Sequence, residues 1–137
     1  MMQFIRNMVR IFWLPTLVLV LNFTPTAQRL MDRGTGFDKI IHAIGGAAIA
    51  YISFLALRIY GKNWWVQTPW FVKCFFVIML IAFSGVAWEV YEFASDTFRG
   101  THMQPNNADT MGDLITDILF GALAAFFIAF RNKKSRN

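Results

Sequence analysis

The chain has little charge and almost no cysteine. Only 15% of its 137 residues are charged and 56% are hydrophobic, whereas a soluble domain has about 25% charged residues. The apolar content excludes a disordered chain, and the scarcity of charge argues against nucleic acid as the partner for the net charge of +5. The single cysteine, Cys74, excludes an intrachain disulfide. No P-loop, Rossmann fingerprint, nucleophile elbow or CxxC pair occurs, so no motif supports a nucleotide- or cofactor-dependent enzyme.

The chain does contain four apolar runs, at 11–23, 40–57, 74–88 and 114–130. With their flanks, the last three reach the roughly 20 residues that a helix needs to cross a bilayer. Because backbone groups in lipid must satisfy one another, the runs are expected to be helical. The sequence therefore predicts a single all-α membrane domain over 1–137. Its four transmembrane helices are expected at about 8–27, 38–60, 70–95 and 111–131.

The first run has two interpretations. Arg6 and Arg10 precede a short apolar stretch that ends in small residues before Ala27, which is also the pattern of a cleaved secretory signal peptide. Pro25 lies two residues before that cut and fits it poorly. A retained helix anchored by the two arginines is therefore favoured, and cleavage would leave three spans.

The basic residues predict an orientation. With a cytoplasmic N-terminus, most of the 13 basic residues lie on the inner side, as the positive-inside rule requires. We expect a multi-pass protein of the bacterial cytoplasmic (inner) membrane with both termini in the cytoplasm. Anionic membrane lipids are the expected partners of the basic tail. The inner residues are Arg6, Arg10, Arg58, Lys62, Lys73, Arg131, Lys133, Lys134 and Arg136, and the outer ones are Arg29, Arg33, Lys39 and Arg99.

In this topology all eight acidic residues fall on the outer half. Three on the third helix are spaced i, i+3, i+7 and three on the fourth i, i+4, i+8, so each set shares one helix face. On the second helix an aspartate precedes a histidine by four residues. Small residues continue these faces, so the helices are expected to approach closely and to enclose one polar pocket. The residues are Asp38 and His42; Glu89, Glu92 and Asp96; and Asp109, Asp113 and Asp117; Asp32 is the remaining acid.

Carboxylates inside a membrane need compensation. They can bind a divalent metal ion, take up protons, or pair with Lys39, Arg29, Arg33 and Arg99, and the sequence leaves these three hypotheses open. A metal would polarise a phosphoryl group, with His42 or a free carboxylate as general base. Proton uptake predicts a proton- or cation-coupled transport component, which at this length would need to form a homo-oligomer. Pairing predicts a structural ion-pair network. The candidate metal ligands are Asp38, His42, Glu89, Glu92, Asp113 and Asp117, of which His42, Glu89, Glu92 and Asp113 are the candidate catalytic residues.

Some polar and aromatic residues have simpler predicted roles. His102 is expected to be solvated in the loop before the fourth helix. The candidates to cap that helix are Asn106, Asn107, Asp109 and Thr110, with Thr110 or Asp109 as the expected N-cap. Amphipathic rings favour the membrane interface. The inner loop is therefore expected to place Tyr60, Trp64, Trp65 and Trp70 there.

Three short motifs give the chain a resemblance to a known family. They read DKIIH at 38–42, WExxEF at 88–93 and DTxGDxxxDxxxG at 109–121. This pattern resembles small bacterial membrane proteins of the VanZ-like and YjdF-like type over about 37–130. The resemblance implies a four-helix integral membrane protein with a role in the cell envelope, and it assigns no reaction. From the topology and the acidic residues themselves, we expect the pocket to open toward the outer face and to act on an envelope lipid or a polar headgroup. The second motif has Glu where VanZ itself has Gln, so the YjdF-like branch is nearer.

Overall fold

The computed structural model describes residues 2–32 and 36–134, without the side chains at 22, 28, 31, 32, 62, 64 and 132–134. Within these ranges the chain is helical, with no strand. Four helices are long and apolar enough to cross a membrane, which confirms the predicted all-α architecture. They are α1 (Met2–Asn22), α3 (Phe37–Tyr60), α5 (Trp70–Arg99) and α6 (Asn107–Lys134), with the shorter α2 (Pro25–Asp32) and α4 (Lys62–Gln67) between them.

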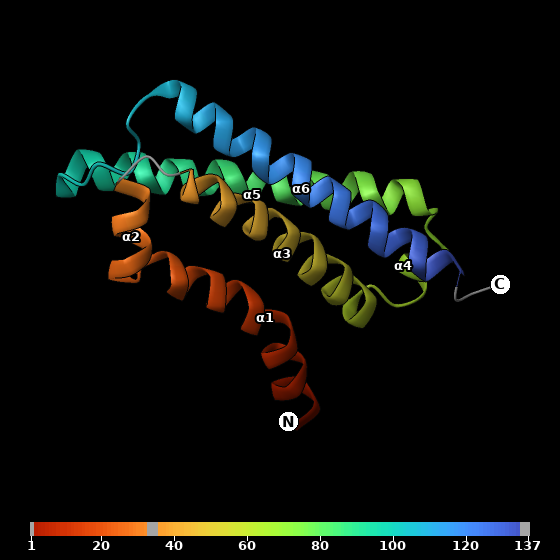
Figure 1. The fold of residues 1–137 in the computed structure, drawn as a ribbon. Coiled ribbons are helices and arrows are strands. Elements are labelled where there is room, and N and C mark those ends of the chain that lie inside the picture. The colour runs from red at the N-terminus through yellow and green to blue at the C-terminus, as the bar shows by residue number, and fades with distance from the viewer. Residues whose placement is uncertain (1, 33–35, 135–137) are drawn as a thin grey trace.

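Helices α3, α5 and α6 run side by side as a bundle, and α1 diverges from them (Figure 1). The main packing is between α3 and α6; α5 packs on both of these helices, and α1 packs along α3. One end of the bundle, at the left of Figure 1, brings together α2, the start of α3, the end of α5 and the start of α6. We call it the acidic end. The opposite end, with α4 and the C-terminus, is the basic end.

The first long helix ends earlier than the sequence predicts, at Asn22 instead of residue 27. Thr24 interrupts it, because its Oγ1 donates a hydrogen bond to the Leu21 carbonyl and accepts one from the Ala27 backbone N–H. Pro25 follows as the first residue of α2, where a missing N–H costs nothing. The segment is therefore two helices joined at a capped turn.

Small residues set the close approach of the bundle helices, as predicted. A Cβ at Gly46 of α3 would collide with the backbone carbonyl oxygen of Asp117 on α6. A Cβ at Gly121 would lie 2.7 Å from Ile81 Cδ1 of α5 and 3.0 Å from the Gly46 carbonyl oxygen. The two glycines therefore let the backbones of α3 and α6 touch.

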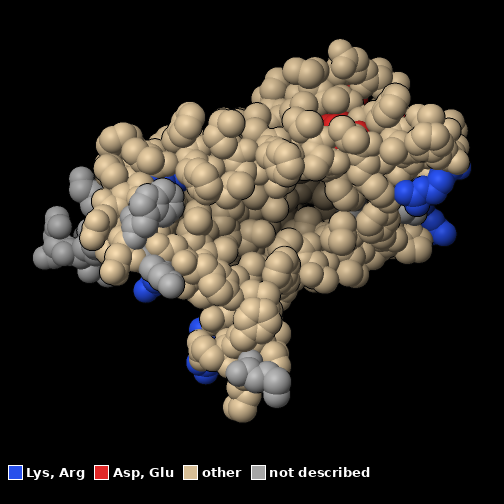
Figure 2. Space-filling model, turned by 180° about the vertical axis from the view of Figure 1, so that it is seen from behind, with Lys and Arg blue, Asp and Glu red and all other residues tan. Residues whose placement is uncertain are grey.

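Large apolar side chains cover the outside of the bundle. Phe75 and Phe127, for example, are 67% and 63% exposed. Figure 2 shows a broad uncharged surface, with Lys and Arg near its margins. Such a surface suits contact with lipid hydrocarbon, as expected for a membrane protein.

The loop between the second and third spans contains a helix that the sequence did not predict. In α4, Trp65 is buried instead of lying at the interface, and its ring centroid lies 5.9 Å from that of Phe54. Lys73 Nζ lies 5.3 Å from the centroid of the Trp65 ring. Tyr60 and Trp70 are exposed, and the Trp64 side chain lies outside the described part of the chain.

Candidate functional site

A lysine on α3 forms hydrogen bonds with two aspartates of α6 at the acidic end. Lys39 Nζ donates to Asp109 Oδ1 at 2.8 Å and to the Asp109 carbonyl oxygen at 3.1 Å. It also donates to Asp113 Oδ1 at 2.6 Å, and Asp38 Oδ2 lies 3.7 Å away. The pairing of basic residues with the acids, one of the three hypotheses from the sequence, is therefore present for Lys39. It links α3 to α6.

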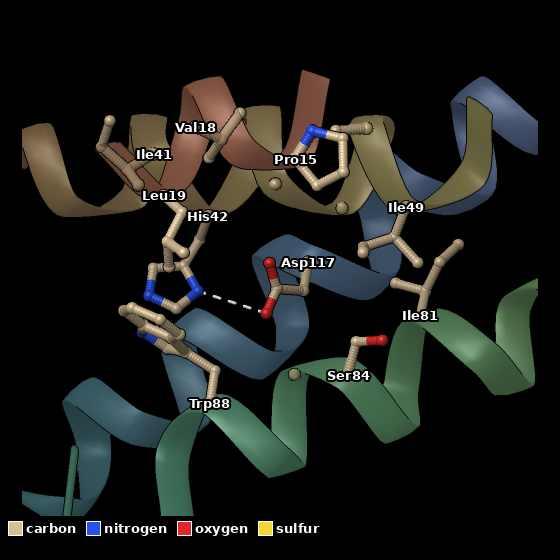
Figure 3. A pocket seen from close by; sticks show the side chains of 14 residues that line it. Pro15, Val18, Leu19, Ile41, His42, Ile49, Ile81, Ser84, Trp88 and Asp117 are labelled. Carbon is tan, nitrogen blue, oxygen red and sulfur yellow. Dashed lines mark hydrogen bonds and ion pairs between the residues drawn. The ribbon is translucent and has the colours of Figure 1, made fainter. Parts of the chain in front are cut away.

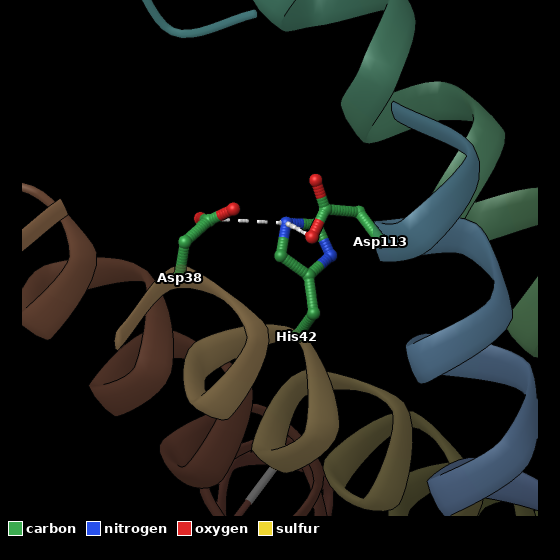
Figure 4. Close-up of side chains that lie close together, drawn as sticks. All are labelled: Asp38, His42 and Asp113. Carbon is green, nitrogen blue, oxygen red and sulfur yellow. Dashed lines mark ion pairs between the residues drawn. The ribbon is translucent and has the colours of Figure 1, made fainter. Parts of the chain in front are cut away.

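His42 lies one helical turn deeper and faces three carboxylates. Its Nε2 is 3.8 Å from Asp38 Oδ1 and 3.7 Å from Asp113 Oδ1 (Figure 4). Its Nδ1 is 3.2 Å from Asp117 Oδ2. His42, Asp113 and Asp117 are all buried. The i, i+4 spacings on α3 and α6 thus bring four of the six predicted ligands together, with three carboxylates around the imidazole of the fourth.

Three of these residues fit a metal ion. One ligand atom each from Asp38, His42 and Asp113 lies within 4.8 Å of the other two. Carboxylate oxygens and an imidazole nitrogen suit Zn²⁺, Mn²⁺ or Fe²⁺. Asp117 lies on the other nitrogen of the imidazole, where it is placed to orient the ring.

The two glutamates of α5 have different partners. Glu89 Oε2 accepts a hydrogen bond from Gln104 Nε2 at 2.7 Å, and its buried Oε1 has no partner among the described residues. Glu92 Oε1 accepts a hydrogen bond from Trp88 Nε1 at 2.7 Å. Both side chains are buried. The predicted six-ligand set therefore divides into a group of four, His42 with three aspartates around it, and two glutamates that accept hydrogen bonds from neutral donors.

The remaining acid of α5 organises the loop before α6. Asp96 accepts hydrogen bonds from Thr101 Oγ1 at 2.6 Å and from the backbone N–H groups of Met103 and Gln104 at 2.8 and 2.9 Å. These bonds place Gln104 against Glu89. Sequence reasoning missed Gln104, because loop residues carry no periodic signal.

The basic residues predicted to bridge the acids differ in position. Arg99 donates to Ser95 Oγ at 2.9 Å, and its guanidinium carbon lies 5.5 Å from the centroid of the Tyr91 ring. Arg29 is exposed. Arg33 and the side chain of Asp32 lie outside the described part of the chain.

The expected N-cap of the last helix is wrong, and Asn106, another of the candidate residues, caps it instead. Neither Asp109 nor Thr110 caps it, because α6 begins at Asn107 and the Asn106 Oδ1 accepts a hydrogen bond from the Asp109 backbone N–H at 3.1 Å. The earlier start places Asp117 about 15 Å along the helix at 1.5 Å per residue. His102 is exposed, as predicted.

A cavity of about 250 Å³ adjoins the imidazole (Figure 3). Its walls come from α1, α3 and α5, with Asp117 contributed by α6. Sequence reasoning missed the α1 wall, since a uniformly apolar run does not reveal which face packs inward. The lining residues used below are Val18, His42, Ile49, Ser84, Trp88 and Asp117.

Comparison with known proteins agrees with the architecture. The model of a family described as "Predicted membrane protein (DUF2238)" matches residues 8–135. The chain belongs to this family. A Thermotoga maritima protein, whose printed name is "Uncharacterized protein", is 36% identical over 101 residues. The match covers 73% of this chain and 50% of the relative, so the chain spans about half of that protein's length. No solved structure matches.

Proposed function

We propose that this DUF2238 protein holds a divalent cation at the acidic end and uses it to bind the polar headgroup of an envelope lipid. One observation carries the proposal. His42 Nε2 faces Asp38 and Asp113 while its Nδ1 faces Asp117. Metal-ligating histidines usually place their second nitrogen against a carboxylate in this way.

The distances are close to those of a coordinated ion. With bonds of about 2.0–2.1 Å, two ligand atoms on a tetrahedral zinc lie about 3.3 Å apart. The Nε2 of His42 is 3.7 Å from Asp113 and 3.8 Å from Asp38. A shift of about 0.5 Å brings each carboxylate to that spacing from Nε2, and the ligand atoms of Asp38 and Asp113 lie within 4.8 Å of each other. Three protein ligands leave a position for a water or a headgroup oxygen, as in catalytic zinc sites, and a cation there would polarise a phosphoryl group.

The charge balance supports a cation. Asp38, Asp109, Asp113 and Asp117 surround one ammonium group, that of Lys39, and one imidazole. Even with the imidazole protonated, four negative charges face two positive ones. Because unpaired charges are costly in a membrane, the site favours a further positive charge.

The wider cellular role rests on the family resemblance and on charge. The motifs resemble the VanZ-like and YjdF-like type, which supports a role in the cell envelope. The positive-inside rule supports a cytoplasmic-membrane location with the acidic end facing outward and both termini in the cytoplasm.

One of the two alternatives, the structural ion-pair network, has a specific observation in its favour. Lys39 already donates to both Asp109 and Asp113, as a structural ion-pair network requires. A metal would share Asp113 with this lysine. A proton-coupled carrier would use the same carboxylates without a metal.

Metal analysis of the detergent-purified protein tests the proposal. We expect about one equivalent of Zn²⁺, Mn²⁺ or Fe²⁺ per chain in the wild type, and loss of most of it in His42→Gln and Asp113→Asn. His102→Gln is the matched control, because it removes the exposed histidine. Glu92→Gln is a second control, because it neutralises an equally buried carboxylate outside the group of three.

The outcomes separate the alternatives. Metal-free wild-type protein, or equal loss of metal in the His102 variant, would refute the proposal. Metal-free protein that moves protons across liposomes would favour the carrier. Metal-free protein without proton movement, in which Asp113→Asn changes only thermal stability, would favour the ion-pair network.

A further inference from the structure

The cavity beside His42 has an apolar wall and one polar end. It extends from His42 and Trp88 at the acidic end to Ile49 of α3, deeper in the bundle. Seven residues separate His42 from Ile49, so the cavity follows α3 for about 10 Å. This length suits a segment of hydrocarbon chain lying parallel to the helices.

The polar end presents an oxygen to the cavity. Asp117 Oδ2 faces His42, and Figure 3 draws no interaction to the other oxygen, Oδ1, among the residues that line the cavity. Glycines make room for this carboxylate. A Cβ at Gly85 would lie 2.9 Å from Oδ2, and a Cβ at Gly45 would lie 3.9 Å from Oδ1. An acceptor oxygen in an apolar cavity selects for a hydrogen-bond donor.

The cavity is covered at the acidic end and flanked by α1. Phe23, just after α1, packs against Trp88 and Tyr91 of α5, with ring centroids 6.2 and 6.3 Å apart. Farther along, α1 packs on α3. Figure 2 shows a hollow in the tan, uncharged part of this face, away from Lys and Arg. A ligand can therefore reach the cavity sideways from lipid.

We propose that this cavity binds the hydrocarbon chain of one membrane lipid whose polar end is a hydroxyl group that donates a hydrogen bond to Asp117 Oδ1. The cation of the proposed function supplies the further positive charge that the carboxylates favour, so the cavity ligand need not carry one. A hydroxyl is then favoured over an ammonium group because a neutral donor loses less hydration free energy on burial. This proposal names a class of lipid as the ligand of the proposed function. It rests on the proposed function for the position of the lipid's polar end beside His42. Chain binding itself depends only on the cavity.

Photolabelling in liposomes tests this assignment. The probes are a long-chain alcohol with a diazirine in its chain, the methyl ether of the same alcohol, and the amine of the same chain, at equal mole fraction. We expect the alcohol to label peptides of α1, α3 and α5 that line the cavity at least fivefold more than the ether. The ether keeps the chain and loses the donor, so it measures partition from bulk lipid.

Two variants of α1 provide a matched pair. Val18 lines the cavity and Val20 is exposed outside it. Val18→Trp fills the cavity and is expected to reduce alcohol labelling at least fivefold, whereas Val20→Trp is expected to change it less than twofold. If Val18→Trp fails to fold, as judged by size-exclusion chromatography, Ser84→Leu fills the cavity from α5.

The outcomes are distinguishable from those of the metal test. Equal labelling by alcohol and ether, stronger labelling by the amine, or unchanged labelling in the folded cavity-filling variant would overturn the assignment. Selective alcohol labelling of a protein that holds no metal would support the cavity ligand and refute only the metal-based function. Full occupancy by metal without selective alcohol labelling would refute the cavity ligand and support the metal-based function.

Discussion

Removing the lysine that links α3 to α6 is the sharpest test of how the acidic end is stabilised. Lys39→Met keeps the length of the side chain and removes the ammonium group, so Asp113, with a side chain only 2% exposed, loses its nearest cation. Removing one partner of a buried pair costs about 3–5 kcal/mol. Lys39 is 35% exposed and Asp109 is 27% exposed. Water therefore screens part of the interaction, and we expect the free energy of unfolding to fall by about 2–3 kcal/mol.

The assay is reversible unfolding in mixed micelles, followed by helical circular dichroism in a chelating buffer. Lys73→Met is the control, because it makes the same substitution at a lysine that lies over the Trp65 ring, away from the carboxylates of the acidic end. The double variant Lys39→Met/Asp113→Asn is expected to recover at least half of the loss, since it removes the buried charge as well.

Two results would refute this reasoning. One is a loss below about 0.5 kcal/mol, the level of an ordinary surface substitution. The other is a double variant no more stable than Lys39→Met. The proposed function adds a further expectation, because a divalent cation can replace the missing ammonium. Added Mn²⁺ or Zn²⁺ should therefore raise the stability of Lys39→Met more than that of the wild type.

Four further substitutions have expected outcomes in the same unfolding assay. Gly46→Ala forces α3 away from α6 and should cost about 1–3 kcal/mol, whereas Gly45→Ala, whose Cβ meets an atom only at 3.9 Å, should be neutral or stabilising. Gln104→Leu leaves the Glu89 carboxylate without its side-chain donor and should cost about 1–3 kcal/mol. Trp88→Phe removes an indole donor to a buried carboxylate and should cost a similar amount. Equal effects of the two glycine substitutions, or losses below about 0.5 kcal/mol for the other two, would contradict these interpretations.

The sequence predicted the helices better than their ends. Long apolar runs require helices in lipid, so four helices and an all-α fold followed from the sequence alone. The ends depend on single side chains, such as the Thr24 hydroxyl that ends α1 and the Asn106 carbonyl that caps α6. Several residues near each end offer the same chemistry, so spacing does not identify which one caps.

Helical periodicity predicted which polar residues share a face, and it did not predict their partners. The four-residue spacing of Asp38 and His42, and of Asp113 and Asp117, brought these side chains together across α3 and α6. The glutamates of α5 also share a face, yet they bind a loop amide and an indole. The position of a residue on a helix face determines the direction in which its side chain points. The hydrogen-bond partner of that side chain depends on where the loop and the neighbouring helices lie. Metal ligation, headgroup binding and homo-oligomer formation remain predictions.

The depth of the charges on α6 bears on how this protein enters the membrane. Asp117 lies about 15 Å from the start of α6, on the acidic-end side of the helix centre, where an aspartate would cost about 2.5–3.5 kcal/mol in translocon-mediated insertion, so its own cost is smaller but still unfavourable. Lys39 and His42 lie on α3, which is synthesised earlier and contacts α6 more than any other helix. The last span therefore enters most readily after α3 is in place, so biogenesis is expected to follow the order in which the ribosome delivers the helices.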